Sequence, residues 1–169
     1  MKAIDSERVL QIFKDSRALL EGHFELRSGL HSDRYFECAK VLTYPRYAGE
    51  LCDALAEAIK AGLGRVESKF VIAPAMGGIV VGHELARALD LQSIFAEKKG
   101  GVLELRRFEI EPGTKYIVAE DVITRGGRVQ ETVDIVKRGG GIVEAIGVFV
   151  DRSGGKAVYY SKTLQTIYA

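Results

Sequence analysis

The stretch Ile117–Val129, IVAEDVITRGGRV, is the most informative part of this chain for both fold and chemistry. An apolar strand leads into two adjacent carboxylates, Glu120 and Asp121, and then into a hydroxyl and two glycines at the expected start of a helix. Backbone N–H groups at a helix N-terminus bind anions, and glycines let a phosphate approach closely. The carboxylates would repel that phosphate, so they suit sugar hydroxyls or a hydrated Mg²⁺. The stretch therefore predicts a site for a ribose 5-phosphate.

A simple polar turn would also explain a glycine pair, because short glycine motifs are common. Two other phosphate-binding motifs are absent from this segment. It has no Gly-x-x-x-x-Gly-Lys loop, and no Gly-x-Gly-x-x-Gly sequence follows the strand.

The same order of strand, glycine turn and helix recurs on both sides of this stretch. We expect strands over 70–73, 93–96, 115–119 and 142–150, with helices over 79–89 and 127–138. This alternation predicts an α/β fold with a doubly wound, mainly parallel sheet and helices on both faces. Ligands bind at the carboxyl ends of such strands, which selects 74–78, 97–107, 120–128 and 151–155.

The N-terminal third follows a different pattern. A helix is expected from about Asp5, and Pro45 opens another that ends near Gly62 and Gly64. Between them, 23–38 is predicted to form a hairpin-like arm. We therefore expect one domain over 1–169, in which 67–155 is the core and 1–66 with 156–169 form a small hood and flanking elements.

Composition narrows the function classes. The 169 residues carry 24 Lys and Arg against 23 Asp and Glu, so no broad basic surface for nucleic acid is expected. No apolar stretch is long enough for a membrane span, and the first ten residues lack the apolar core of a signal peptide, which predicts a cytoplasmic protein. Two cysteines are too few for a zinc site, and both are expected to be reduced.

Four segments together resemble one enzyme family. Val118–Val129 resembles the binding motif for phosphoribosyl pyrophosphate (PRPP) of the type I phosphoribosyltransferases. Phe24–Phe36, FELRSGLHSDRYF, resembles the N-terminal signature of the orotate phosphoribosyltransferases. Pro74–Gly78, PAMGG, and Asp151–Gly155, DRSGG, resemble that family at corresponding places and in the same order.

This resemblance implies the type I phosphoribosyltransferase fold and a reaction of UMP biosynthesis. PRPP and orotate would give orotidine 5'-monophosphate and pyrophosphate, with Mg²⁺ carried by PRPP and reached through water from the two carboxylates. Catalytic roles would fall to Asp121, Glu120 and Lys98. The implied PRPP-binding residues are Glu120, Asp121, Val122, Ile123, Thr124, Arg125, Gly126, Gly127, Arg128, Arg27, Met76, Gly77 and Lys98. The implied orotate-binding residues are Thr124, Arg152, Tyr35 and Phe36.

The charged segment 97–107 has two interpretations. On its residues alone it is a solvated hairpin outside the core. The resemblance instead implies a lid that closes over pyrophosphate in the neighbouring subunit of a homodimer, with Lys98 as the candidate for the contact with pyrophosphate and Lys99 and Arg106 behind it. The chain departs from the family where Val102 replaces a lysine, and where Arg125 and Arg128 stand in the phosphate loop.

Two alternative functions stay open. One is a phosphoribosyltransferase for another base, against which the Ser28-Gly29 arm and Arg152 argue. The other is a PRPP-sensing regulatory protein that binds nucleic acid, against which the balanced charge argues. His23, His31 and His83 are expected to be structural, because a histidine without a catalytic partner usually is.

Overall fold

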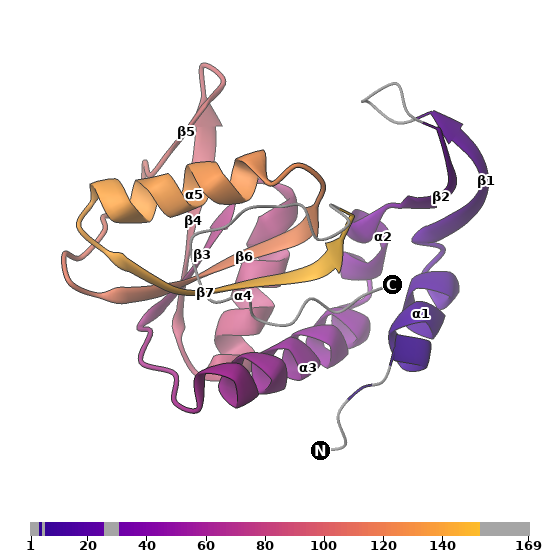
Figure 1. Cartoon of the computed structure of the whole chain (residues 1–169), viewed down its shortest axis with the longest axis horizontal. Coiled ribbons are helices and arrows are strands. Elements are labelled where there is room, and N and C mark those ends of the chain that lie inside the picture. Colours follow the sequence, from indigo (N-terminus) through magenta and orange to yellow (C-terminus); the bar gives the residue numbers. More distant parts are fainter. Residues whose placement is uncertain (1–3, 5, 26–30, 153–169) are drawn as a thin grey trace.

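In the part of the chain that the computed structural model describes, the central sheet has five strands in the order β5-β4-β3-β6-β7 (Figure 1). The structure describes residues 4, 6–25 and 31–152. Strand β3 pairs in parallel with β4 and β6, β6 pairs in parallel with β7, and the short β5 runs antiparallel to β4. The strand bounds are β3 (Phe70–Pro74), β4 (Gln92–Lys99), β5 (Val102–Glu104), β6 (Lys115–Ile123) and β7 (Ile142–Asp151).

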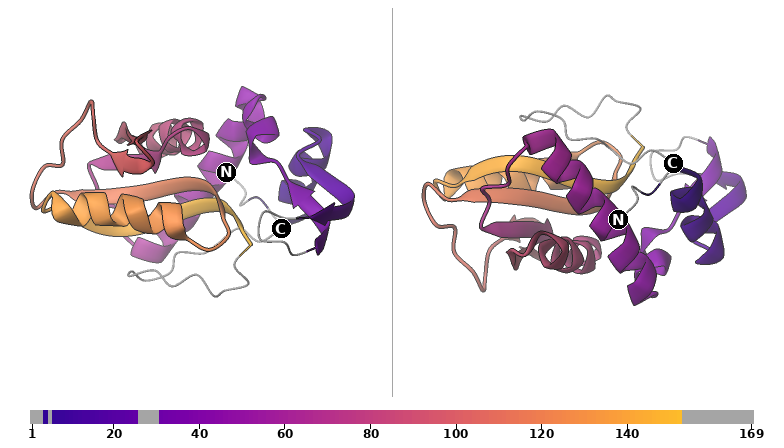
Figure 2. Two further views of the ribbon diagram at one scale, coloured as in Figure 1. Left: turned by 90° about the horizontal axis from the view of Figure 1, so that it is seen from above. Right: turned by 90° about the horizontal axis from the view of Figure 1, so that it is seen from below.

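Helices cover both faces of this sheet, as Figures 1 and 2 show. Helices α3 (Pro45–Leu63) and α4 (Gly77–Leu89) lie on one face, and α5 (Gly127–Arg138) lies on the other. Helix α4 leads from β3 to β4, whereas α5 leads from β6 to β7, so the chain leaves the neighbouring strands β3 and β6 in opposite directions. The carboxyl ends of β3 and β6 therefore flank the place where doubly wound sheets bind ligands. The predicted fold class is confirmed.

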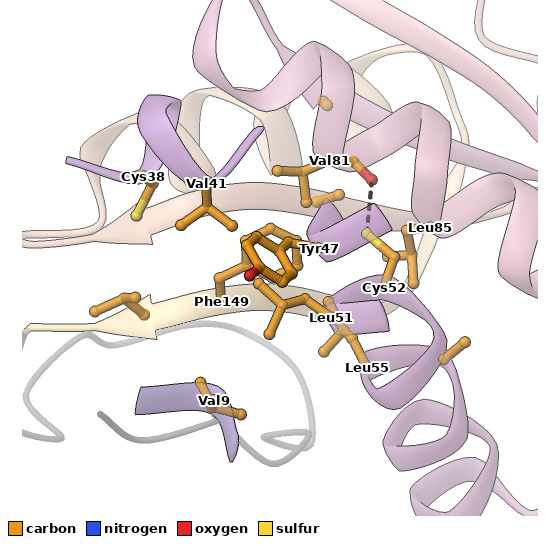
Figure 3. Close-up of a cluster of buried hydrophobic side chains, with 14 of the residues drawn as sticks. Val9, Cys38, Val41, Tyr47, Leu51, Cys52, Leu55, Val81, Leu85 and Phe149 are labelled. Atoms are coloured by element: carbon orange, nitrogen blue, oxygen red, sulfur yellow. Dashed lines mark hydrogen bonds between the residues drawn. The ribbon is translucent and has the colours of Figure 1, made fainter. Parts of the chain in front are cut away.

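The alternation of side chains along β6 separates two apolar cores. Ile117 and Ala119 are fully buried against the side covered by α3 and α4, and Tyr116 and Val118 are fully buried against the side covered by α5. The first core extends to α1 (Ser6–Asp15) and α2 (Cys38–Leu42), and Figure 3 shows its side chains converging from these helices and the sheet. A strand that is apolar on both faces is typical of a parallel sheet with two helical layers.

The predicted hairpin arm is present. Strands β1 (Leu19–Glu25) and β2 (His31–Phe36) pair antiparallel and lie beyond the end of the sheet at which β7 stops (Figure 1). Phe36 packs edge-on against Phe13 of α1, with ring centroids 5.7 Å apart. The arm is thereby fixed to the same apolar core that supports β6.

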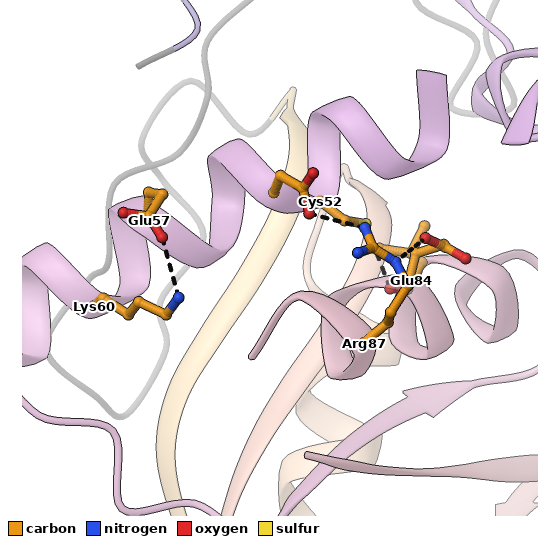
Figure 4. Close-up of polar contacts among 7 residues, drawn as sticks. Cys52, Glu57, Lys60, Glu84 and Arg87 are labelled. Carbon is orange, nitrogen blue, oxygen red and sulfur yellow. Dashed lines mark hydrogen bonds and ion pairs between the residues drawn. The ribbon is translucent and has the colours of Figure 1, made fainter. Parts of the chain in front are cut away.

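Ion pairs on the surface connect the helices without adding much stability. Arg87 of α4 donates to Glu84 and to Asp53 of α3, each at 2.8 Å, and Lys60 contacts Glu57 along α3 at 3.0 Å (Figure 4). Exposed pairs of this kind contribute about 0–1 kcal/mol each. The apolar contacts between α3, α4 and the sheet therefore hold this layer together.

Several elements differ from the sequence prediction, and β4 is longer at both ends than the predicted 93–96. Strand β6 continues to Ile123 instead of ending at Ala119, because its pairing with β7 persists past Glu120. Helix α4 begins at Gly77 instead of residue 79, and the short helix α2 was not predicted. Segment 97–108 does form a hairpin, but the prediction that it lies outside the core is wrong, because Leu103 is 3% exposed and packs with the residues under α5.

Candidate active site

The two carboxylates of the decisive stretch lie at the carboxyl end of β6, against the N-terminus of α4. A Cβ atom placed on Gly77 would be 2.9 Å from Oδ2 of Asp121, and one placed on Gly78 would be 3.3 Å from Oε1 of Glu120. The glycines thus let the first turn of α4 approach both carboxylates. This contact joins the β3–α4 turn and the β6 end, which are the two sides of the predicted ligand position.

Glu120 is buried and only partly satisfied. Its side chain belongs to a residue that is 2% exposed, its Oε1 accepts the N–H of Asp121 at 3.1 Å, and its Oε2 has no hydrogen-bond partner among the described residues. Burial and the neighbouring Asp121 raise the pKa of Glu120 to about 8, and Arg128 opposes this shift. A buried oxygen without a partner is costly, so this carboxyl is suited to a hydroxyl group of a ligand.

Asp121 is half-buried and held by its own backbone. Its Oδ1 accepts the N–H of Val122 at 2.7 Å, and its carbonyl oxygen lies 3.8 Å from the Sγ of Cys38 in α2. Both cysteines are free, as expected, and burial raises the pKa of the Cys38 thiol, which therefore stays protonated. Cys38 is a site neighbour that sequence reasoning missed, because 83 residues separate it from Asp121 and no local pattern connects them.

The loop after β6 presents open backbone and positive charge. Gly126 caps α5 in the left-handed conformation (φ 81°), and the helix has no side-chain cap. A Cβ on Gly127 would meet nothing within 4 Å, and Thr124, Arg125 and Arg128 are exposed. The N-terminus of α5 therefore has an uncapped start, open space at Gly127 and two exposed arginines in the same short segment, which suits an anion.

The turn between β3 and α4 is tied to the neighbouring strand. The N–H of Ala75 donates to the carbonyl of Ala96 in β4 at 2.7 Å, and the Ala75–Met76 peptide is cis. Met76 is 81% exposed at the N-cap of α4. Met76 therefore directly precedes the glycines that approach the two carboxylates, in a turn that the resemblance implies binds PRPP.

The residues predicted to contact orotate come from both ends of the described chain. The N–H of Arg152 donates to the carbonyl of Ile123 at 2.8 Å, which places Arg152 beside Thr124 in the loop. The guanidinium carbon of Arg152 lies 5.9 Å from the centre of the Phe36 ring. Tyr35 is 38% exposed and its ring lies on that of Phe24, with centroids 5.7 Å apart. The arm and the core therefore meet at this edge of the site.

Lys98 lies on the β4–β5 hairpin, opposite Leu103 in the register. It is exposed and falls on the same side of β4 as the buried Ala96, which is the side covered by α5. Arg107, which follows the hairpin, forms an ion pair with Glu97 of β4 at 3.0 Å. Of the other residues predicted for the site, Arg27 lies outside the described residues, as do Ser28, Gly29 and positions 153–155.

No family model matches the chain, but many curated proteins do. It is 49% identical over 167 residues to orotate phosphoribosyltransferase of Caldicellulosiruptor saccharolyticus, which covers 97% of this chain and 85% of that protein. It is 50% identical over 155 residues to the protein of the same name from Chlorobium phaeobacteroides, which covers 91% and 78% of the two chains. The identity is thus spread along nearly the whole chain.

Solved structures share the fold. Orotate phosphoribosyltransferase from Aeropyrum pernix matches with a TM-score of 0.77 at 24% identity, over 95% of this chain and 92% of that chain. Adenine phosphoribosyltransferase from Rhodothermus marinus matches with a TM-score of 0.69 at 22% identity, over 96% and 98%. None of the described helices has the length and apolarity to cross a bilayer.

Proposed function

The chain belongs to the orotate phosphoribosyltransferase family, and from this premise we propose that it transfers the ribose 5-phosphate group of PRPP to orotate, giving orotidine 5'-monophosphate and pyrophosphate. One observation carries the assignment of the site. The buried, unpartnered Oε2 of Glu120 and the open N-terminus of α5 lie on one short segment, at the carboxyl end of β6. A ribose 5-phosphate presents matching hydroxyls and phosphate.

The chemistry requires little nucleophilic help from the protein. Displacement at the anomeric carbon of ribose develops positive charge on the sugar while pyrophosphate departs, and the nitrogen of orotate forms the new bond. In our proposal Asp121 supplies negative charge close to that developing cation. Glu120 holds a ribose hydroxyl, since a buried protonated carboxyl can both donate and accept a hydrogen bond.

Binding of the two phosphate ends is assigned to two different helix N-termini. The 5-phosphate would be held by Thr124–Arg128, where the exposed backbone of α5 combines with two guanidinium groups. Pyrophosphate would lie by Met76 and Gly77 at the start of α4. Lys98 would neutralise the departing charge from the hairpin.

Orotate differs from the other common bases by its carboxylate. Arg152 is suited to that group because a guanidinium binds a carboxylate through paired hydrogen bonds. In our proposal the Phe36 ring, 5.9 Å from the Arg152 guanidinium carbon, lies along the planar base, with Tyr35 at its edge. Adenine, hypoxanthine and uracil have no carboxylate, so Arg152 would have no negative charge to pair with on these bases.

Mg²⁺ fits the site as a partner of the substrate. Carboxylate oxygens are ligands that Mg²⁺ prefers, so Asp121, together with Glu120 in its ionised form, would hold the hydrated ion through water. When bound, the ion supplies positive charge to the pyrophosphate oxygens.

The base specificity is tested by a turnover assay with PRPP, Mg²⁺ and a panel of orotate, uracil, adenine and hypoxanthine. Turnover with orotate alone is expected, because only orotate presents a carboxylate to Arg152. Adenine is included in the panel because adenine phosphoribosyltransferases share this fold, so the fold alone does not distinguish the bases. Use of another base in preference to orotate would contradict the proposal.

We also propose a homodimer in which Lys98 acts in the neighbouring subunit. The supporting observation is that Lys98 stands on a hairpin at the edge of the sheet, two strands away from β6. A mixture of Lys98→Ala and Asp121→Asn chains should then regain part of the activity that each lacks, since each mixed dimer holds one site with both groups intact. If subunits exchange and the mixture is no more active than its parts, the site is not shared.

A further inference from the structure

The arm carries a pair of histidines that the proposed reaction does not use. His23 of β1 and His31 of β2 face each other across the hairpin, with Nε2 of His23 2.7 Å from Nδ1 of His31 and ring centroids 4.7 Å apart. Both residues are exposed. Among the described residues, the only hydrogen bond of either ring is to the other.

The local backbone explains why the two rings meet. The β1–β2 register is regular from Phe24↔Ser32 to Glu25↔His31, but it shifts between Glu21 and Phe24. His23 lies in that shifted stretch. The pairs Phe24↔Ser32 and Glu25↔His31 put His23 and His31 on the same face of the hairpin as diagonal neighbours, within reach of each other. The two rings are thus held side by side by two paired strands.

We propose that this pair is a binding site for a borderline transition-metal ion of the Ni²⁺ or Cu²⁺ class. Neutral imidazole is the commonest metal ligand in proteins, and here a nitrogen of each ring lies within hydrogen-bond distance of the other, so a metal ion that replaces this hydrogen bond would contact both rings. With metal–nitrogen distances of about 2.0–2.1 Å, two ligands at a right angle are about 2.9 Å apart and two tetrahedral ligands about 3.3 Å apart.

The observed 2.7 Å is a hydrogen-bond distance, so either arrangement requires the two nitrogen atoms to move apart when a metal ion replaces the hydrogen bond. Ni²⁺ and Cu²⁺ are favoured because they stand highest in the order of affinity of nitrogen ligands for divalent first-row metals. Water would complete the coordination, since no group of three or more His, Cys, Asp or Glu side chains placed to hold a metal occurs in the described part of the chain. A hard cation such as Mg²⁺ prefers oxygen ligands and should not bind here.

The chain offers its own matched control. It contains three histidines, and the third, His83, is also exposed but lies on α4, away from the arm. Ni²⁺ alone is titrated by calorimetry into the untagged full chain, into His23→Gln, His31→Gln and His83→Gln, and into the His23/His31 double variant. Far-UV circular dichroism in the presence of a chelator checks that each variant is folded.

The expected result is one Ni²⁺ per chain, with affinity unchanged in His83→Gln and undisturbed by millimolar Mg²⁺. Each single arm variant should lose about tenfold or more in affinity, because removing a direct ligand costs at least as much as removing a residue that only orients one. The double variant should bind no better than either single variant. Equal affinity in the wild type and an arm variant, an equal loss in His83→Gln, or displacement by Mg²⁺ would overturn the proposal. The test measures metal binding alone, so it succeeds or fails independently of the proposed reaction.

Discussion

The backbone of Gly77 lies against the carboxylate of Asp121, so closely that a Cβ at position 77 would be 2.9 Å from Oδ2. Real Cβ atoms essentially never come this near a neighbouring atom, and the atom in question belongs to the proposed catalytic group. The turn after β3 and the end of β6 therefore pack directly against each other. A side chain at position 77 would push the Asp121 carboxylate out of its place, so this position requires glycine.

Gly77→Ala should therefore damage activity more than stability. The new methyl group displaces the Asp121 carboxylate, and a displacement of this kind in a catalytic site costs about tenfold to a hundredfold in kcat/KM. Gly49→Ala is the matched control, because a Cβ there would meet only the tips of Arg87 and Glu84 at 3.6 and 3.8 Å. In the helix α3 that change should keep full activity and stabilise the chain by about 0.5–1 kcal/mol. Steady-state kinetics and urea unfolding on both variants check the contrast, and a fully active Gly77→Ala enzyme would show that the contact is unimportant.

Asp121→Asn removes charge while keeping shape. Because the side chain is half-buried and its Oδ1 bond to the Val122 N–H is available to an amide oxygen, the fold should be unchanged. Turnover should fall by about a hundredfold, the usual loss when one preorganised electrostatic group is removed from a transition state. Kinetics with saturating PRPP measure it. Wild-type turnover in this variant would eliminate the proposed role.

The sequence made the parts of this site predictable to different degrees. The carboxylates, the α5 N-terminus and the sheet were predictable because periodicity and glycine placement are local signals, and α5 begins and ends where the sequence indicates. The end of β6 could not be predicted from the sequence. The polar residues at 120–121 suggest a turn, and only their pairing with β7 keeps them extended. The contact of Cys38 with Asp121 and the burial of Leu103 depend on tertiary packing, which no local pattern records.

The buried Glu120 carboxyl makes stability depend on pH. Its folded pKa is raised from 4.5 to about 8, so the folded chain keeps a proton that the unfolded chain releases across this interval. The stabilising effect of that proton is complete below about pH 4.5 and is lost as the pH rises through about 8. Glu120→Gln has no such proton to lose, so its unfolding free energy should decline less with pH than that of the wild type.

Between pH 4.5 and about 8, the unfolding free energy of the wild type should fall with pH more steeply than that of Glu120→Gln. The difference between the two slopes should approach, and not exceed, about 1.4 kcal/mol per pH unit. Urea unfolding at several pH values between about 5 and 8 measures it. Parallel curves for the two proteins would mean that Glu120 titrates alike in the folded and unfolded chains.

Arg152→Ala should separate the two substrates. Its side chain is assigned to the orotate carboxylate, and loss of a charged hydrogen-bonding partner costs about 1.5–3 kcal/mol, or roughly tenfold to a hundredfold in affinity. The KM for orotate should rise by this factor while the KM for PRPP changes little. Equal increases in both constants would indicate that the Arg152 side chain supports the structure of the site instead of binding the base, because the backbone bond from Arg152 to Ile123 is kept in the alanine variant.

The central claim is that this chain joins orotate to the ribose of PRPP, and the stoichiometry of a single reaction tests it most directly. Purified chain is incubated with PRPP, orotate and Mg²⁺, and the products are separated and quantified. We predict one orotidine 5'-monophosphate and one pyrophosphate for each orotate consumed, with no release of pyrophosphate when orotate is omitted and a sharply reduced yield from Asp121→Asn. Release of pyrophosphate without consumption of orotate, or no consumption of either substrate by the folded protein, would contradict the account.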